Sequence, residues 1–283
     1  MLLDCHTHTH NSPDADNKSV ADLCRRAVEM GLDTLAVTDH CEANRFYSME
    51  YYNAVPQPDN EYDTYDFRDY FFKSMAENTE AKELFKGKLN FVCGIELGQA
   101  NRDLKAADEI LADKRLDFII GSMHEIPNHL DFAFLDYSKE NIPLLLDEYF
   151  NEIYKLCQWG KFDVLGHLTY TLRYIEGEYG FKADMSPYNE IIAESFRLIA
   201  QKGKGIEINT SGLRQKYKKT FPTLEYVKLF RDLGGEIISV GSDSHTPDDL
   251  AKGIKEGLKI AAAAGFKNVC RFEKHEPVFM PIE

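Results

Sequence analysis

Short apolar runs alternate with longer amphipathic segments along the whole chain of 283 residues. The runs have the length and boundaries of buried strands, and the segments between them have helical spacing. Nearly continuous apolar strands separated by helices favour a parallel sheet covered on its outer face, and at this length closure into a barrel is expected. We therefore predict an α/β fold, a distorted (β/α)7 TIM-like barrel formed as one domain over 1–283. The predicted strands are 2–3, 34–37, 89–92, 118–120, 162–165, 205–208 and 236–240, and the predicted helices are 19–30, 67–85, 103–114, 140–159, 187–202, 223–233 and 249–264.

One long connection, at about 41–66, interrupts the alternation. It is rich in tyrosines and acids and contains two prolines, and connections of this length are either functional lids or solvated excursions. We interpret it as a lid-like loop and keep the solvated excursion as the alternative. The tail at 268–283 has short apolar pieces, and we expect it to close the floor of the barrel.

The charge balance argues against nucleic-acid binding. The chain has 33 Lys and Arg against 47 Asp and Glu, a formal net charge of -14, which repels phosphate backbones. No apolar run is long enough for a membrane span, and the N-terminus lacks the features of a signal peptide. Six scattered cysteines without Cys-x-x-Cys pairs indicate reduced thiols. We expect a cytoplasmic protein without membrane partners, either a monomer or a homodimer.

Metal-binding residue types follow the predicted strands. Six of the nine histidines lie within a few residues of a strand end. All strands of a parallel barrel direct their C-terminal ends to one face, where barrel enzymes build their active sites. A single histidine there is usually an ordinary core or surface residue. Two pairs at i and i+2 are more specific, since such side chains project to the same side of an extended chain. The candidate ligands are His6, His8, His40, Glu96, His124, His167, Asp243 and His245, and Asp39 and Glu207 are further acids at strand ends.

The chemistry of this set predicts several ions. Nitrogen and carboxylate ligands without thiolate suit zinc, manganese or iron. The set contains more ligands than one four- to six-coordinate ion can use, so we expect two or three divalent metal ions at the C-terminal face of the strands. His10, His129 and His275 lie elsewhere and are interpreted as bystanders.

Two arginines complete the predicted site. Arg173 follows His167, and Arg214 follows the sixth predicted strand. A guanidinium group binds phosphate as a bidentate fork, so we interpret both as catalytic phosphate contacts, with a surface salt bridge as the alternative. Glu207 and Asn209 either position a substrate or line the barrel mouth. Glu42 is a hypothetical acceptor for a substrate ammonium group.

The motifs HTHTH, TDH, GIELG, GSMH, GHL and GSDSH, which run from His6 to His245, resemble the polymerase and histidinol phosphatase (PHP) superfamily. The segments GIELG, GHLTY and INTSGLR are similar to its monofunctional histidinol-phosphatase branch. The resemblance implies a trinuclear site. Asp14 stands where other members carry a histidine six residues after the His-x-His motif. The implied ligands are His6, His8, Glu96 and Asp243 for the first ion, Glu96, His124 and His167 for the second, and His40, His245 and Asp14 for the third.

The same resemblance implies the activity, hydrolysis of the phosphate monoester L-histidinol phosphate to L-histidinol and inorganic phosphate in histidine biosynthesis. Clustered ions lower the pKa of bound water, and our hypothesis is attack by a metal-bridging hydroxide without a phosphoenzyme. Asp243 and His245 would take part in catalysis as ligands. The alternatives are another PHP phosphoesterase, acting on phosphotyrosine, a nucleotide or another small ester, a metal-dependent amidohydrolase, and a metal-stabilised binding protein without turnover.

Overall fold

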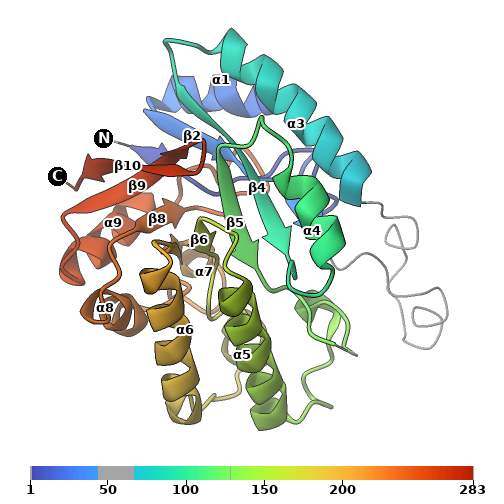
Figure 1. Cartoon of the computed structure of the whole chain (residues 1–283), viewed down its shortest axis with the longest axis vertical. Helices are drawn as coiled ribbons and strands as arrows, with labels where there is room; N and C mark the ends of the chain where they lie inside the picture. The colour runs from blue at the N-terminus through green and yellow to red at the C-terminus, as the bar shows by residue number, and fades with distance from the viewer. Residues whose placement is uncertain (1, 44–66, 128, 283) are drawn as a thin grey trace.

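The structure, a computed structural model, describes residues 2–43, 67–127 and 129–282. A parallel sheet forms its centre, with helices around the outer side (Figure 1). Seven strands pair in the order β1-β2-β4-β5-β6-β7-β8, and every pair is parallel. Their bounds are β1 Leu3–Asp4, β2 Thr34–Val37, β4 Asn90–Gly98, β5 Phe118–Ser122, β6 Val164–Leu165, β7 Gly205–Asn209 and β8 Ile238–Gly241.

The two ends of this strand order meet. The Cys5 amide donates to the Val240 carbonyl over 3.0 Å, and an isolated parallel bridge joins Thr7 to Ser244. The sheet is therefore nearly closed into a barrel, which confirms the predicted fold class. All seven predicted strands overlap an observed strand of this sheet.

One further strand, β3 (His40–Glu42), was not predicted. It pairs with the C-terminal half of β4, whose N-terminal half pairs with β2, so β2 and β3 lie in line along one long neighbour. The sequence His-Cys-Glu has no apolar alternation, which is why it was assigned to the long loop. The rest of the predicted lid, 44–66, lies outside the described residues.

Capping side chains fix where several helices begin. Ser19 and Asp22 form a capping box at the start of α1, and Asn141 caps α5. In Figure 1, α1 and α3 lie side by side along the top of the view, and α5 and α6 along the bottom. The helices are α1 Val20–Met30, α3 Phe67–Leu84, α4 Leu104–Leu111, α5 Ile142–Trp159, α6 Asn189–Gln201, α7 Ser211–Arg214, α8 Leu224–Asp232 and α9 Ile254–Ala263, with short turns η2 Phe132–Phe134, η3 Arg173–Glu178 and η4 Ser186–Tyr188.

Helix α9 begins five residues later than predicted. Ala251 and Gly253 adopt φ angles of 58° and 82°, and this left-handed backbone prevents a helix from starting at Asp249. Within the described ranges, no helix combines the length and apolar character that a membrane span requires. All six cysteines are buried and free, as predicted.

The C-terminal tail forms an antiparallel hairpin of β9 (Asn268–Glu273) and β10 (Glu276–Pro281). The Phe272 ring stacks on Phe118 at 4.6 Å between centroids, and the His275 amide donates to the carbonyl of Asp117, just before β5. Both contacts are at the N-terminal ends of the strands. The prediction that the tail closes the barrel floor is confirmed.

Candidate metal centre

The predicted ligands gather at the C-terminal ends of the strands, as expected. They come from β3, β4 and the segments that follow β1, β5, β6 and β8. The His8 ring lies 4.3 Å from His40 and 4.1 Å from His245 between centroids, and the His124 and His167 rings are 5.2 Å apart. Side chains spread over 240 positions of sequence thus form one cluster.

Four ligand groups face one point. The Nε2 atoms of His6 and His8 are 3.1 Å apart, and Glu96 Oε2 lies 3.2 Å from the first and 3.5 Å from the second. Asp243 Oδ1 lies 3.2 Å from His8 Nε2 and 3.8 Å from His6 Nε2. Two imidazoles and two carboxylates at these separations can bind a single divalent ion.

The other oxygen of Glu96 faces a second group. Glu96 Oε1 lies 3.1 Å from His124 Nε2 and 2.7 Å from His167 Nε2, and the two imidazole nitrogens are 3.3 Å apart. Glu96 therefore directs one oxygen to each group, the arrangement of a bridging carboxylate.

The third group is more open. His245 Nε2 lies 3.1 Å from Asp14 Oδ2, and His40 Nε2 lies 3.6 Å from Asp14 Oδ1. The Asp14 side chain is 51% exposed. The residues that the resemblance implied for a third ion are thus together, at the solvent side of the cluster.

Hydrogen bonds behind the rings show that a cation fits this cluster. His6 Nδ1 donates to Glu207 Oε1 over 2.6 Å, and His124 Nδ1 donates to Glu42 Oε1 over 2.9 Å. A proton on Nδ1 leaves a lone pair on Nε2 of the neutral ring. Within the described residues, the buried Glu96 Oε2 also has no hydrogen-bond donor. The Nε2 lone pairs of the histidines face one another around the Glu96 carboxylate, and a cation between these atoms would stabilise the arrangement.

In the metal-free protein, the pKa values of the ligands show how closely the imidazoles and carboxylates are packed. Burial opposes charge on His6, but the carboxylates of Glu207 and Glu96 raise its pKa well above the ordinary value. Burial and the neighbouring His245 and His40 hold the pKa of His8 well below it. Burial also opposes ionisation of Glu96, yet the surrounding imidazoles keep its pKa well below its usual range. A divalent ion would take the place of protons that the carboxylates attract.

Several predicted site residues support the ligands. Glu207, 1% exposed, holds His6 and also accepts from the His167 amide. Asn209 donates to Asp243 Oδ2 over 3.2 Å. Both side chains therefore contact residues of the ligand cluster, and their alternative roles, positioning a substrate or lining the barrel mouth, stay predictions. Asp39 is likewise no ligand, since it accepts from Thr9, Ser12 and Ser74.

Arg214 contacts the backbone of the ligand Asp243. Its Nη1 and Nη2 donate to the carbonyls of Ser242 and Asp243, each over 2.6 Å, and its Nε pairs with Asp249 at 3.2 Å. Asp243 has a φ of 54°, a left-handed backbone that is uncommon for residues other than glycine. The guanidinium group thus holds the backbone of a ligand, and its predicted phosphate contact stays a prediction.

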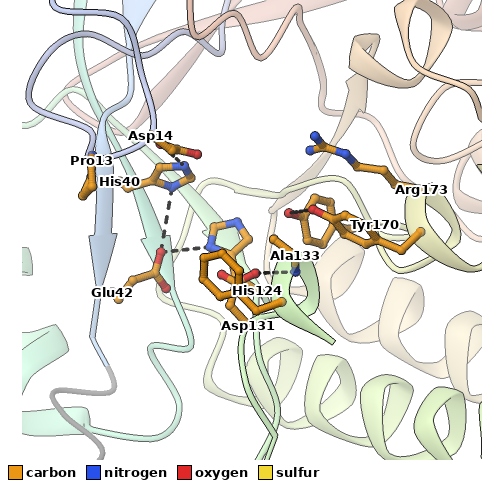
Figure 2. A pocket seen from close by; sticks show the side chains of 11 residues that line it. Pro13, Asp14, His40, Glu42, His124, Asp131, Ala133, Tyr170 and Arg173 are labelled. Carbon is orange, nitrogen blue, oxygen red and sulfur yellow. Dashed lines mark hydrogen bonds and ion pairs between the residues drawn. The ribbon is translucent and has the colours of Figure 1, made fainter. Parts of the chain in front are cut away.

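A cavity of about 190 Å³ opens beside the cluster (Figure 2). Arg173 lines it, and its guanidinium carbon lies 5.2 Å and 6.0 Å from the ring centroids of Tyr174 and Tyr170. Among the described residues this half-buried cation has neither a hydrogen bond nor an ion pair. Arg173 is therefore a charge available to an anion in the cavity, and its phosphate contact stays a prediction.

Glu42 lines the same cavity, but its oxygens accept from His124 Nδ1 and, over 2.8 Å, from Gln99 Nε2. It orients a ligand, a role that the ammonium hypothesis did not include. The three predicted bystanders lie outside the cluster: His10 pairs with Glu77, His129 contacts the Pro127 carbonyl and His275 pairs with Asp163.

Sequence reasoning missed three polar lining residues, Asp131, Tyr170 and Tyr174. Tyr170 lies midway between His167 and Arg173, and that spacing was a usable signal. Asp131 has no such signal, because the segment after β5 shows no periodicity that predicts its path.

Comparisons with known proteins agree with this geometry. The chain is 27% identical to the histidinol-phosphatase of Lactococcus lactis over 276 residues, covering 95% of this chain and 94% of that protein. It is 27% identical to a probable histidinol-phosphatase of Clostridium acetobutylicum over 281 residues, covering 97% and 98%. The crystal structure of the Lactococcus lactis histidinol phosphate phosphatase, complexed with zinc, L-histidinol and phosphate, superposes with a TM-score of 0.76 at 23% identity, covering 98% of both chains. The fold is therefore that of this enzyme.

The model of the PHP domain matches residues 4–211. This range holds the cluster's ligands up to His167, and it covers well over half of the chain. The chain therefore belongs to the PHP domain family.

Proposed function

We propose that this protein is a metal-dependent phosphomonoesterase that hydrolyses L-histidinol phosphate to L-histidinol and inorganic phosphate. The observation that carries the proposal is the cluster of metal-type ligands beside a cavity lined by Arg173, whose guanidinium has no ion pair within the described residues. Metal ligands and an unpaired cation at one cavity suit a phosphate ester. Relatives that match almost the whole chain carry the name histidinol-phosphatase.

Two or three divalent ions would be held by the three groups of ligands. The ligand types suit zinc, manganese or iron, and zinc is the ion in the Lactococcus lactis structure. When bound, such ions supply a water molecule of lowered pKa as nucleophile and neutralise the phosphate oxygens. The proposed ligands are His6, His8, Glu96 and Asp243, then Glu96, His124 and His167, and on the open side His40, His245 and Asp14.

The chain's own residues do the rest. Arg173 binds non-bridging oxygens of the phosphate. Glu207 and Glu42 keep the protons of His6 and His124 on Nδ1, so that Nε2 faces inward. Arg214 acts as a positioning residue that holds the backbone of Asp243.

The alternatives from the sequence have unequal support. A metal-dependent amidohydrolase would have a lysine-type bridge between its metals, whereas Glu96 lies between the two groups of ligands here. Another PHP phosphoesterase would use every ligand described here and differ only in substrate. One domain, a monomeric or dimeric state and a cytoplasmic location stay predictions.

A substrate panel tests the proposal. The metal-loaded protein is assayed for phosphate release from L-histidinol phosphate, phosphotyrosine and nucleoside monophosphates, with chelated protein as the control. We expect kcat/KM to be highest, by about 100-fold or more, for L-histidinol phosphate, with loss of activity on chelation. A higher kcat/KM for another ester would overturn the substrate, and full activity after chelation would overturn the metal dependence.

A further inference from the structure

The cavity beside the metal centre has an acidic side chain that the mechanism does not use. Asp131 precedes η2, and its Oδ1 accepts from the Ala133 amide over 2.7 Å. The turn is fixed to the rim of the barrel, since the Phe132 amide donates to the His124 carbonyl over 2.9 Å. The Tyr137 hydroxyl donates to the Phe132 carbonyl over 3.0 Å, and the Phe132 ring is fully buried. Asp131 is therefore held in place beside a metal ligand.

Within the part of the chain that the structure describes, the carboxylate of Asp131 has no cationic partner. In the described part of the chain, its side chain makes the one hydrogen bond to Ala133 and no ion pair. Burial raises the pKa of Asp131 to about 6, and nearby Glu42 adds to this effect while His124 opposes it. A half-buried carboxylate in this setting is stabilised by any cation that enters the cavity.

Asp131 and Arg173 line the same cavity without pairing to each other. In Figure 2, Asp131 lies in the lower part of the view, joined to Ala133 by a dashed line, and Arg173 lies at the upper right near Tyr170. The Tyr170 and Tyr174 hydroxyls are hydrogen-bonded to each other over 2.8 Å. Within the described residues, the opposite charges of Asp131 and Arg173 line one cavity of about 190 Å³ and do not pair with each other. This arrangement suits a ligand that carries both a negative and a positive charge.

We propose that Asp131 binds the ammonium group of the substrate and thereby selects phosphate esters of amino alcohols. The inference rests on the proposed function for the identity of the ester, and it deepens that function by naming the residue that reads its positive charge. In L-histidinol phosphate the ammonium group is on the carbon next to the phosphorylated one. An ester whose phosphate lies at the metals and Arg173 therefore has its ammonium group a short distance from them. The sequence suggested Glu42 as the acceptor for the substrate ammonium group. We assign this role to Asp131 instead, because the Glu42 oxygens already accept from His124 and Gln99.

The test compares Asp131→Asn with the wild type on L-histidinol phosphate and on its deamino analogue, which keeps the imidazole and the phosphate. Asparagine can still accept from the Ala133 amide, so the turn should fold. Asp136→Asn is the matched control, because Asp136 lies on the same segment and pairs with Lys139 and Ser138 outside the cavity. We expect Asp131→Asn to raise KM for L-histidinol phosphate by roughly 10- to 100-fold, the usual effect of losing a hydrogen bond to a charged group. KM for the deamino analogue should change less than twofold.

An equal loss on both esters would overturn the inference, because Asp131 would then have a structural role or bind the imidazole. No loss on either ester would also overturn it. If the wild type does not hydrolyse L-histidinol phosphate at all, the proposed function fails by itself. In that case, the Asp131 inference is tested by comparing kcat/KM for phosphoethanolamine with kcat/KM for ethyl phosphate. It holds if Asp131→Asn removes a wild-type preference for the amino ester, and it fails if the ratio of the two kcat/KM values does not change.

Discussion

At the scale of single residues, the metal centre depends on side chains that touch no metal. Glu207 and Glu42 fix which nitrogen of His6 and His124 carries the proton. Ser12 does the same for His8, with its Oγ 3.0 Å from Nδ1. A ligand whose ring is oriented in advance loses less freedom when an ion binds, and such outer partners are commonly worth a factor of 10 to 100 in metal affinity.

Replacing Glu207 should therefore weaken metal binding. In Glu207→Gln the acceptor for His6 Nδ1 loses its charge, and we expect zinc affinity to fall by roughly 10- to 100-fold. Competition with a chromogenic chelator measures this. Glu236→Gln, an exposed change just before β8, is the control and should bind zinc like the wild type. Equal affinities for Glu207→Gln and the control would contradict the role given to Glu207.

Substitutions of Arg173 and Arg214 should differ in their effect on metal content. Arg173→Ala removes an unpaired cation from the cavity, so we expect kcat/KM to fall by roughly 10- to 100-fold with the metal content unchanged. Arg214→Ala releases the carbonyls of Ser242 and Asp243, so we expect loss of metal along with activity. Metal analysis of both purified variants, beside phosphate-release assays, distinguishes them. The opposite pattern, with metal lost only from Arg173→Ala, would reverse the assignment.

At the scale of elements, the ligands could be predicted because their places follow from strand ends. Each apolar run sets the end of a strand, and in a parallel barrel that alone places His6, Glu96 and Asp243 on one face. The supporting residues could not be assigned in the same way. Whether Glu207 points into the cavity or behind His6 depends on the twist and register of β7 against β8, which no local pattern specifies. Strand β3 and the turn η2 were missed because neither shows a periodic pattern.

The approach of β8 to β1 leaves no room for a side chain at Gly241. A Cβ there would lie 2.3 Å from His6 Cβ and 2.7 Å from Glu207 Oε1, so the strands would have to move apart. We expect Gly241→Ala to destabilise the fold by about 1–3 kcal/mol, the usual cost of overpacking, and to lower zinc affinity as well. Chemical denaturation and chelator competition measure the two effects. Unchanged zinc affinity would show that closure of the barrel does not position His6.

At the scale of the whole molecule, the centre concentrates negative charge in a chain of formal net charge -14. Divalent ions bound only by the folded protein stabilise it by mass action, about 4 kcal/mol at a thousandfold excess over Kd. For a chain of this length, that corresponds to a rise in Tm of roughly 10 °C. Thermal unfolding of chelated and zinc-loaded protein measures the shift, and equal Tm values would contradict a metal-binding fold.

The rise in Tm caused by zinc should increase with pH. The carboxylates of Glu207 and Glu96 raise the pKa of His6 in the metal-free protein, although burial opposes this. Protonated His6 thus stabilises the metal-free fold at low pH, and this contribution is lost as the pH rises through the raised pKa. Zinc needs the deprotonated ring. We expect the rise in Tm caused by zinc to grow from pH 6 to pH 8, and a shift that shrinks over this range would contradict the argument.

In the proposed metal centre, Glu96 would lie between two ions at the rim of the barrel. Anomalous diffraction at the zinc edge, from crystals of the zinc-loaded protein, tests it most directly. We expect one peak among His6, His8, Glu96 and Asp243, and a second among Glu96, His124 and His167. Zinc bound elsewhere, with no peak on either side of the Glu96 carboxylate, would contradict it.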